Sequence, residues 1–309
     1  MSGVLSGNER QRRQARSNDH SLFVQRLAMP IPLHQAEVIR AAKLIAAADG
    51  LLITAGAGMG VDSGLPDFRS GAGFWGAYPA LGQAGLHFES IASPQAFEDR
   101  PRLAWGFYGH RLNLYRRTIP HDGFRILRDI GNFLPHGAFV FTSNVDGQFQ
   151  RAGFRDTGIC EVHGSIHHLQ CMNGCAVDIW SADDFEPIVD ETTCLLTSGV
   201  PICPHCGGLA RPNVLMFGDW GWLPSRERRQ DQAMKTWLEQ AERPVVIEIG
   251  AGTAIPTARM LGQWTGAPMI RINLRDAQVS RIQDVGLAMG ALDALTAISA
   301  GLSIGDGQK

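Results

Sequence analysis

The stretch that decides the fold is residues 51–69, LLITAGAGMGVDSGLPDFR. It opens with a short apolar run, residues 51–53, which has the length of a buried strand and is bounded at once by glycines. Gly56, Gly58 and Gly60 allow a ligand to approach the backbone closely and leave N–H groups for a diphosphate. The glycines do not decide this by themselves, because the spacing is Gly-x-Gly-x-Gly and tight strand-to-helix turns are glycine-rich without any ligand.

The segment after the glycines, residues 66–69 (Pro-Asp-Phe-Arg), narrows the interpretation. This proline-stiffened loop sets an acid, an aromatic ring and a guanidinium side by side. With it, GAGMGVDSGLPDFR resembles the NAD-binding signature of the sirtuins. The resemblance implies that the glycines hold the diphosphate of NAD and that the Asp-Phe-Arg loop closes over the nicotinamide ribose. The cofactor-binding residues it predicts here are Gly56, Ala57, Gly58, Asp67, Phe68, Arg69 and Trp75.

The composition is that of an ordinary globular protein. A chain of 309 residues suits one large domain with a small insert. Hydrophobic content is 44% and no apolar run reaches the length of a membrane span. The formal net charge of −2 argues against a nucleic-acid-binding surface. Six cysteines without a secretory signal predict a reducing compartment, the cytoplasm, and favour metal ligands or free thiols over disulfides. The sequence does not indicate an oligomeric state.

Residues 1–33 are predicted to be a flexible N-terminal extension. Their arginines resemble those of a mitochondrial presequence, but Glu9 and Asp19 interrupt the pattern and no cleavage site is evident.

Apolar runs alternate with helical stretches along the rest of the chain. A helix is expected over 35–48, where apolar residues recur at helical spacing before Asp49-Gly50. The alternation predicts an α/β fold with a doubly wound, Rossmann-like parallel sheet, whose ligands bind at the carboxyl ends of the strands. The expected strands are 51–53, 139–141, 244–250 and 269–274. The expected parts are Rossmann-like segments at about 34–70, 121–160 and 212–309, an aromatic-rich helical insert at about 71–120, and a zinc ribbon at about 165–211.

Two close cysteine pairs predict a structural zinc site. Cys171-x3-Cys175 and Cys203-x2-Cys206 have the spacing of paired zinc knuckles, whereas four unrelated thiols are the alternative. Four thiolate ligands leave no open coordination position, so the metal would hold together a ribbon too small to have its own core. Sirtuins carry such a ribbon at this point in the chain.

The candidate catalytic residues lie just before the first knuckle. A lone histidine is usually structural, but His163 lies in the segment EVHGS, which resembles the His-Gly segment of the sirtuins. The resemblance implies that His163 is the general base, a task that suits a near-neutral imidazole. The segment TSNVD, 142–146, matches the family's Thr-Gln-Asn-Ile-Asp, with Ser143 in place of glutamine and thus one ribose contact fewer. In the family, Asn144 would hold the nicotinamide ribose and a water, and Asp146 would contribute to the carboxamide pocket.

Two later segments complete the NAD resemblance. Residues 250–253 (GAGT) resemble the family's Gly-Thr-Ser segment, and Asn273 matches the asparagine that holds the adenosine ribose. The resemblance covers residues from about 35 to about 300. The further cofactor-binding residues predicted are Ser143, Asn144, Asp146, Gly250, Ala251, Gly252, Thr253, Asn273 and Leu274.

The substrate segments depart from the common family pattern. Where sirtuins have Phe-Gly-Glu before a Leu-Pro pair, this chain has Phe217 and Gly218 followed by Asp-Trp-Gly-Trp. The aspartate and two tryptophans change a loop that is expected to accept an acyl-lysine peptide by β-addition. Tyr108-x-x-Arg111, with the small Ala80 upstream, resembles the desuccinylase type of sirtuin, in which tyrosine and arginine bind an acyl carboxylate. The alternative is that Arg111 faces solvent on a helix.

The predicted function is NAD-dependent deacylation of protein lysines. In the mechanism that the resemblance implies, the acyl oxygen attacks C1′ as nicotinamide leaves, and the acyl group ends on ADP-ribose. The alternative is a sirtuin-like ADP-ribosyltransferase or NAD glycohydrolase, and a third class is a silent NAD sensor. The presence of His163 favours deacylation over both.

Overall fold

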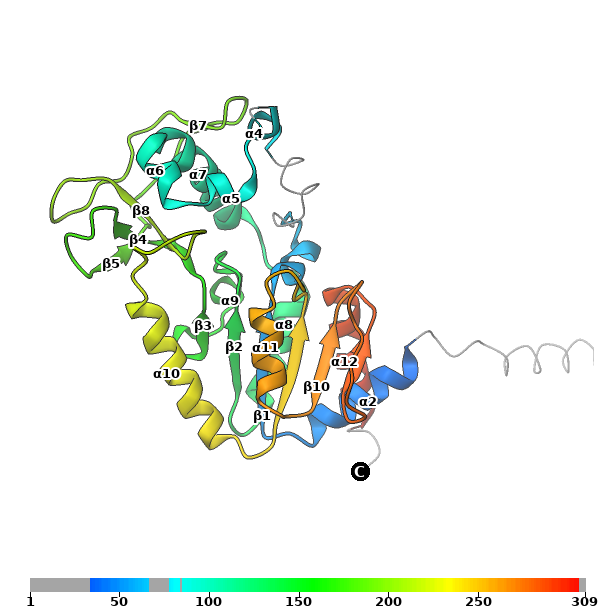
Figure 1. The fold of residues 1–309 in the computed structure, drawn as a ribbon. Coiled ribbons are helices and arrows are strands. Elements are labelled where there is room, and N and C mark those ends of the chain that lie inside the picture. The colour runs from blue at the N-terminus through cyan, green and yellow to red at the C-terminus, as the bar shows by residue number, and fades with distance from the viewer. Residues whose placement is uncertain (1–33, 67–77, 84, 306–309) are drawn as a thin grey trace, which may run out of the picture. The chain divides into compact units, whose positions relative to one another are not determined.

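A computed structural model describes residues 34–66, 78–83 and 85–305 (Figure 1). The predicted extension at 1–33 and the predicted NAD-binding residues Asp67, Phe68, Arg69 and Trp75 lie outside these residues. Glu37–Lys309 form one compact unit, which contains the sheets and helices of the fold.

A six-stranded sheet forms the larger part of this unit, in the order β11-β10-β9-β1-β2-β3, and every neighbouring pair is parallel. The strands are β1 (Gly50–Ala55), β2 (Ala138–Thr142), β3 (Ile159–Glu161), β9 (Pro244–Ile249), β10 (Met269–Ile272) and β11 (Val285–Leu287). From β1 the chain adds strands first toward β3 and later, from β9, toward β11. The order therefore changes direction between β1 and β9, and ligands bind at such a point in open α/β sheets.

Helices cover both faces of this sheet (Figure 1). Alternate side chains of β1 divide between two cores, because Leu51 and Ile53 point to one face and Leu52 to the other. The first face is covered by α2 (Gln35–Ala46), α8 (Asp122–Phe133) and α12 (Ala291–Gly305). The second is covered by α10 (Ser225–Gln240) and α11 (Thr257–Trp264). The predicted doubly wound α/β fold is confirmed.

Short elements connect these larger ones. After β1 comes the 3-10 helix η1 (Ala57–Ser63), and between β2 and β3 come α9 (Gln148–Arg151) and η2 (Asp156–Gly158). The four predicted strands are present, but β3 and β11 were not predicted. Each has only three residues and therefore shows no periodicity.

A smaller module packs around its own aromatic core (Figure 1, upper part). Its helices are α4 (Pro79–Gln83), α5 (Phe88–Ile91), α6 (Pro94–Asp99) and α7 (Pro101–Arg117). They share this core with an antiparallel sheet of β5 (Ile179–Ser181), β4 (Gly164–Cys171) and β8 (Ala210–Val214), and with the pair β6 (Val189–Asp190) and β7 (Leu195–Leu196). The expected boundary at residue 212 falls inside β8, which pairs with β4 as far as Val214.

Among the described residues, no helix combines the length and the apolar character needed to cross a membrane.

Candidate active site

The candidate site lies at the carboxyl edge of the six-stranded sheet, over the point where the strand order changes direction. Gly56 follows β1 and Gly250 follows β9, and their two loops touch backbone to backbone. The N–H of Gly56 donates to the carbonyl of Ile249 at 3.0 Å, and the N–H of Gly58 donates to the carbonyl of Gly250 at 3.1 Å. These bonds continue the pairing of β1 with β9 beyond the ends of both strands.

This loop contact is the reason that glycines are needed. A Cβ atom at Gly56 would lie 2.7 Å from the carbonyl oxygen of Gly250, and one at Gly58 would lie 2.7 Å from the Cα of Gly250. Gly250 itself has φ 58°, a left-handed conformation that favours glycine. Both N–H groups therefore donate to the neighbouring strand or loop, and the contact of these glycines with a diphosphate stays a prediction.

Two residues after β2 are fixed against β1 and its loop. Ser143 is buried, and its N–H donates to the carbonyl of Ala55 at 3.0 Å. The side-chain Nδ2 of Asn144 donates to the carbonyl of Gly56 at 2.9 Å, and its backbone N–H donates to Thr142 Oγ1 at 3.0 Å. The carboxamide of Asn144 therefore has a defined orientation, with Oδ1 as its acceptor atom.

Asn273, which follows β10, joins its own loop to the loop after β9 by hydrogen bonds. Its Nδ2 donates to the carbonyl of Ala251 at 3.1 Å, and its Oδ1 accepts the N–H groups of Arg275 and Asp276, each at 3.0 Å. Ala251 is buried, whereas Leu274 is exposed. The neighbouring Gly252 and Thr253 are also exposed.

A buried ion pair beneath these loops was not predicted. Glu248 of β9 and Arg271 of β10 are buried and form two hydrogen bonds, Nε–Oε1 at 2.7 Å and Nη2–Oε2 at 2.9 Å. Arg259 of α11 lies 3.7 Å from Glu248 Oε1 and donates to the carbonyl of Ala251 at 3.0 Å. The sequence carries a signal for the pair, because opposite charges interrupt two apolar strands at positions that face each other in register.

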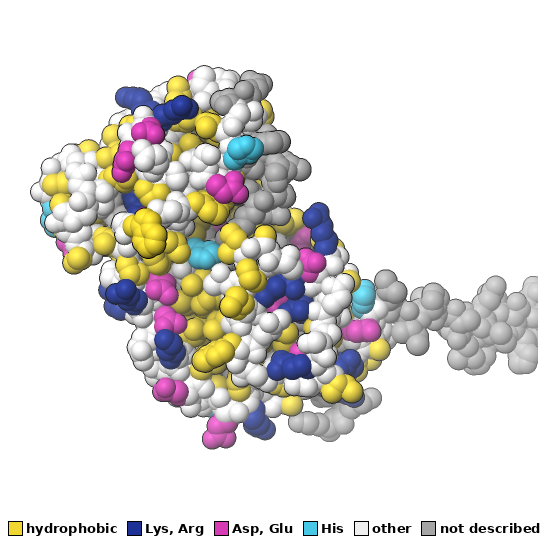
Figure 2. All heavy atoms as spheres, in the orientation of Figure 1, with side chains coloured by type: hydrophobic (Ala, Val, Ile, Leu, Met, Phe, Trp, Pro, Cys, Tyr) yellow, Lys and Arg dark blue, Asp and Glu magenta, His cyan; other side chains and the backbone are white. Residues whose placement is uncertain are grey.

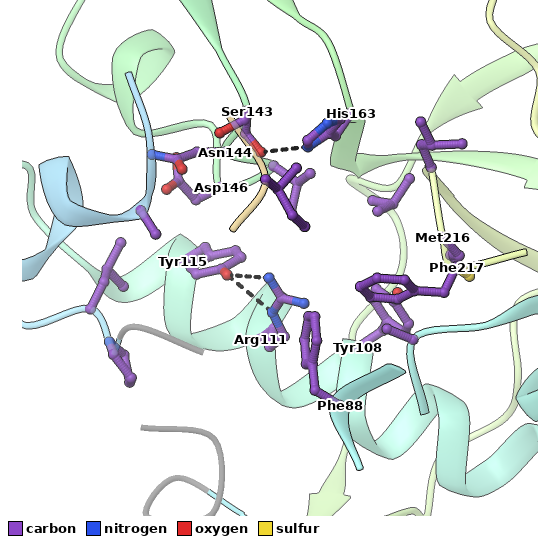
Figure 3. Close-up of a pocket in the computed structure, with 18 residues that line it drawn as sticks. Phe88, Tyr108, Arg111, Tyr115, Ser143, Asn144, Asp146, His163, Met216 and Phe217 are labelled. Atoms are coloured by element: carbon purple, nitrogen blue, oxygen red, sulfur yellow. Dashed lines mark hydrogen bonds between the residues drawn. The ribbon is translucent and has the colours of Figure 1, made fainter. Parts of the chain in front are cut away.

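His163 enters the site from the end of β3. Its backbone carbonyl accepts the N–H of Leu215 at 2.9 Å, and its ring Nδ1 lies 3.2 Å from the carbonyl of Ser143 (Figure 3). A carbonyl oxygen can only accept, so Nδ1 carries the proton and Nε2 is the basic nitrogen of the neutral ring. The backbone of the Ser143 segment thus selects the tautomer that a general base needs.

A second buried acid, at the end of β3, pairs with a residue of α10. Glu161, two residues before His163, forms an ion pair with Arg226 of α10, and its backbone N–H donates to Gln230 Oε1 at 3.1 Å. Burial raises the pKa of the Glu161 carboxyl, and Arg226 opposes that rise. The sequence carries no local signal for this acid, because its partner lies 65 residues away.

One cavity lies between Ser143, Asn144 and His163 and the residues of the helical module (Figure 3). Its volume is about 240 Å³. In Figure 2, hydrophobic side chains gather where the two parts of the unit meet, with a histidine side chain among them. The polar residues that line the cavity are Tyr108, Arg111, Tyr115, Ser143, Asn144, Asp146 and His163. The larger apolar ones are Leu65, Phe88, Val145, Val214, Leu215, Met216, Phe217 and Ile255.

Asp146 contributes a buried carboxyl to this cavity. Its Oδ1 accepts the N–H of Gln148 at 3.0 Å, and its backbone carbonyl accepts from His167 Nε2 at 3.0 Å. Burial raises the pKa of the Asp146 carboxyl to about 6. At neutral pH the carboxylate form is therefore still the major one, and it can accept a hydrogen bond from a ligand.

Tyr108 and Arg111 meet in the cavity on one face of α7. Their exposed fractions are only 1% and 8%, so the alternative in which Arg111 faces solvent is wrong. Burial raises the pKa of the Tyr108 phenol to about 12, so the phenol stays a hydrogen-bond donor at neutral pH. Arg111 donates from Nε and Nη2 to the hydroxyl of Tyr115, at 3.0 and 2.7 Å (Figure 3). Tyr115 was not predicted, although it lies one helical turn beyond Arg111.

Known proteins resemble this chain in sequence and in fold. A sequence model of the Sir2 family matches residues 56–255. The chain belongs to the Sir2 family. It is 31% identical over 251 residues to an NAD-dependent protein deacylase of Thermococcus kodakarensis, covering 79% of this chain and 88% of that protein. It is 32% identical over 237 residues to NAD-dependent protein deacylase 1 of Pseudomonas aeruginosa, covering 75% and 85%. Among solved structures, it resembles a mutant of a Sir2 homologue in complex with ADP-ribose, at 25% identity and TM-score 0.66, covering 87% of this chain and 98% of that one.

The four predicted zinc ligands of this Sir2 protein come together at one point. The sulfurs of Cys171, Cys175, Cys203 and Cys206 all lie within 4.8 Å of one another. Two of the pairs are 3.7 and 3.5 Å apart. A tetrahedral site with Zn–S bonds of about 2.3 Å places its sulfurs roughly 3.8 Å apart, so the cluster fits zinc.

The Asp-Trp-Gly-Trp departure from the Sir2 pattern has a structural explanation at its aspartate. The Asp219 carboxylate is buried and accepts two hydrogen bonds from Arg211 of β8, both at 2.8 Å. It also accepts the N–H groups of Met216 at 3.3 Å and Gly221 at 3.1 Å, which closes the loop. Trp220, between them, is fully exposed.

The other predicted substrate residues differ in their positions. Phe217 lines the cavity, and its N–H donates to the carbonyl of Ala92 at 3.0 Å. Gly218 has φ 66° and forms the turn before Asp219. Ala80 packs against the aromatic core of the helical module and does not belong to the described lining of the cavity.

Removal of zinc is expected to destabilise the fold without changing the NAD residues. The variant Cys203→Ser, or chelation, should release the metal and lower the Tm by roughly 6–12 °C, the shift that a loss of about 3 kcal/mol causes in a domain of this size. Metal content and thermal unfolding measure this. Cys194→Ala is the control, because Cys194 is buried in the same module outside the cluster. A metal-free protein with unchanged Tm and turnover would contradict the zinc assignment.

Proposed function

We propose that this chain is an NAD-dependent protein lysine deacylase that transfers the acyl group to ADP-ribose and releases nicotinamide. The observation that carries the proposal is the position of His163. Its Nδ1–H donates to the carbonyl of Ser143, its basic nitrogen is Nε2, and it lines the same cavity as Asn144 and three polar residues of α7. A base beside a ribose-binding edge and an acyl-sized cavity is the arrangement that deacylation requires.

The residues proposed to hold NAD lie on the loops after four parallel strands. When bound, NAD supplies an electrophilic ribose carbon with nicotinamide as the leaving group. Its diphosphate is assigned to the glycine loops, and its two riboses to Asn144 and Asn273, whose carboxamides are already oriented by backbone carbonyls. Asp146 offers a buried acceptor for the nicotinamide carboxamide. The predicted residues 67–69 and Trp75 keep the same assignment.

In this proposal His163 takes a proton at Nε2 from a ribose hydroxyl. The carbonyl of Ser143 stabilises the protonated ring, because it keeps accepting from Nδ1 after the charge forms. Asn144 Oδ1 orients the hydroxyl or a water, since its Nδ2 is held by Gly56. The peptide is proposed to bind along the loop that begins at Phe217, which the Arg211–Asp219 pair holds in place.

The acyl group is proposed to carry a carboxylate. The cavity is apolar along Phe88, Val145 and Met216, and its polar groups on α7 are Tyr108, Arg111 and Tyr115. A buried guanidinium and phenol at the wall of an apolar tunnel suit an acidic acyl chain such as succinyl or malonyl. The cytoplasm remains the proposed compartment, and the partner is an acyl-lysine protein or peptide.

Loss of the His163 imidazole should stop acyl transfer while NAD still binds. His163→Ala is expected to lower kcat by about 10²–10⁴-fold, the contribution of a general base, with a smaller change in NAD affinity. Product formation by mass spectrometry and NAD titration measure the two effects. His136→Ala is the control, because His136 is exposed at the opposite edge of the sheet. Full turnover of the His163 variant would rule out the role.

Cleavage of NAD should depend on an acylated acceptor. Nicotinamide release is expected to rise at least about tenfold when an acyl-lysine peptide is added, because the peptide supplies the attacking oxygen. The comparison uses one peptide with and without the acyl group. Rapid release with the unacylated peptide, or with no peptide, would support the transferase or glycohydrolase alternative instead.

Arg111 should set a preference for acidic acyl chains. The wild type is expected to favour succinyl-lysine over acetyl-lysine in kcat/KM by at least about tenfold, since charge-assisted hydrogen bonds contribute about 1.5–3 kcal/mol. Arg111→Met should abolish the preference. Arg125→Met is the matched control, because Arg125 is an exposed arginine of α8 that pairs with Asp122 and Asp129. A preference for acetyl in the wild type would contradict the proposed acyl group.

A further inference from the structure

Arg111 is held in the cavity by a residue that lies one helical turn farther along α7. Both Nε and Nη2 of Arg111 donate to the hydroxyl oxygen of Tyr115, so one whole edge of the guanidinium is engaged. Tyr115 has an exposed fraction of 3% and itself lines the cavity (Figure 3). It is therefore in a position to affect a ligand directly as well as through Arg111.

Aromatic rings confine the same guanidinium. The Cζ atom of Arg111 lies 5.2 Å from the ring centroid of Phe107, 5.8 Å from that of Tyr108 and 5.5 Å from that of Tyr115. Rotation of the planar guanidinium about the Cδ–Nε bond would break the hydrogen bonds from Nε and Nη2 to Tyr115. The orientation of the charge is thus fixed before a ligand arrives, and such preorganisation strengthens binding.

Tyr108, Arg111 and Tyr115 follow one another at spacings of three and four residues. On a helix these spacings place side chains on one face, and all three line the one cavity. Phenol and guanidinium groups all donate hydrogen bonds, and a carboxylate offers about four acceptor sites. A neutral alkyl chain of the same shape offers none and would leave these polar groups facing apolar atoms.

We propose that Tyr115 is a specificity-determining residue of the acyl site. Its hydroxyl positions Arg111 and, with Tyr108 and Arg111, forms a three-residue site for the terminal carboxylate of an acidic acyl chain. The proposal rests on the proposed deacylase function and goes beyond the Tyr-x-x-Arg pair on which the acidic preference was based.

The test compares two acyl chains of equal shape on one enzyme. Succinyl-lysine and 4-methylpentanoyl-lysine peptides differ only at the end of the chain, where the second has an isopropyl group in place of the carboxylate. In the wild type kcat/KM should be higher for succinyl by at least about tenfold. Tyr115→Phe, which removes only the hydroxyl, should lower this ratio by about fivefold or more, mainly through KM for the succinyl peptide.

A double-mutant cycle shows whether the hydroxyl acts through the guanidinium. Arg111→Met should lower the ratio further than Tyr115→Phe, and adding Tyr115→Phe to Arg111→Met should change it little. Tyr78→Phe is the matched control, because Tyr78 is another buried tyrosine, bonded to His110 Nδ1 at 2.8 Å and outside the described cavity lining. It should leave the ratio unchanged.

Three outcomes would overturn the inference. They differ in whether the acidic preference or the proposed function fails with it. If Tyr115→Phe lowers turnover of both peptides equally while Arg111→Met lowers the ratio, Tyr115 is only structural and the acidic preference stands. If the wild type does not favour succinyl over its neutral isostere, the inference and the acidic preference both fail, whether or not any variant folds. If no acyl peptide is processed with NAD, the proposed function itself fails.

Discussion

The backbone contact between the loops after β1 and β9 is the constraint on which the site depends. A Cβ atom on Gly250 would lie 2.4 Å from the carbonyl carbon of Gly58, so these two glycines admit no side chain without a shift of one loop. The contact keeps the two loops of the strand-order change in a single position. Two asparagines bind to these loops: Asn144 donates to the carbonyl of Gly56, and Asn273 donates to that of Ala251.

Three buried ion pairs join the elements that carry this site. Glu248–Arg271 lies beneath the loops after β9 and β10, Glu161–Arg226 joins β3 to α10, and Arg211–Asp219 closes the loop that begins at Phe217. Removal of charges from water costs free energy that their attraction only partly returns. We infer that these pairs contribute geometry more than stability.

The sequence predicted the parts of this arrangement that depend on local patterns. The strands 51–53, 139–141, 244–250 and 269–274 are continuous apolar runs, and the four zinc cysteines follow a spacing that chemistry explains. His163 and Asn144 came from family resemblance, since a histidine or an asparagine alone carries no such information.

What the sequence did not predict depends on contacts between distant residues. Gly56 and Gly58 have no room for a side chain because their backbone contacts Gly250, almost two hundred residues away in the sequence. Local spacing could not show this contact. Asp219 could not be explained without its contact with Arg211. Tyr115 could not be placed in the cavity without knowing which face of α7 lines it. Both tyrosines of that site lie in a dense aromatic segment, where most rings only pack a core.

We infer that NAD binding requires the contact between the two glycine loops. The most direct test of this requirement is the affinity of Gly58→Ala for NAD, measured by calorimetry beside the thermal stability of the same variant. Gly199→Ala serves as the reference, because a Cβ there meets no atom within 4 Å. We expect Gly58→Ala to bind NAD at least about tenfold more weakly, since either loop must move, while Gly199→Ala keeps wild-type affinity. Wild-type affinity in a folded Gly58→Ala variant would show that NAD binding does not require the loop contact.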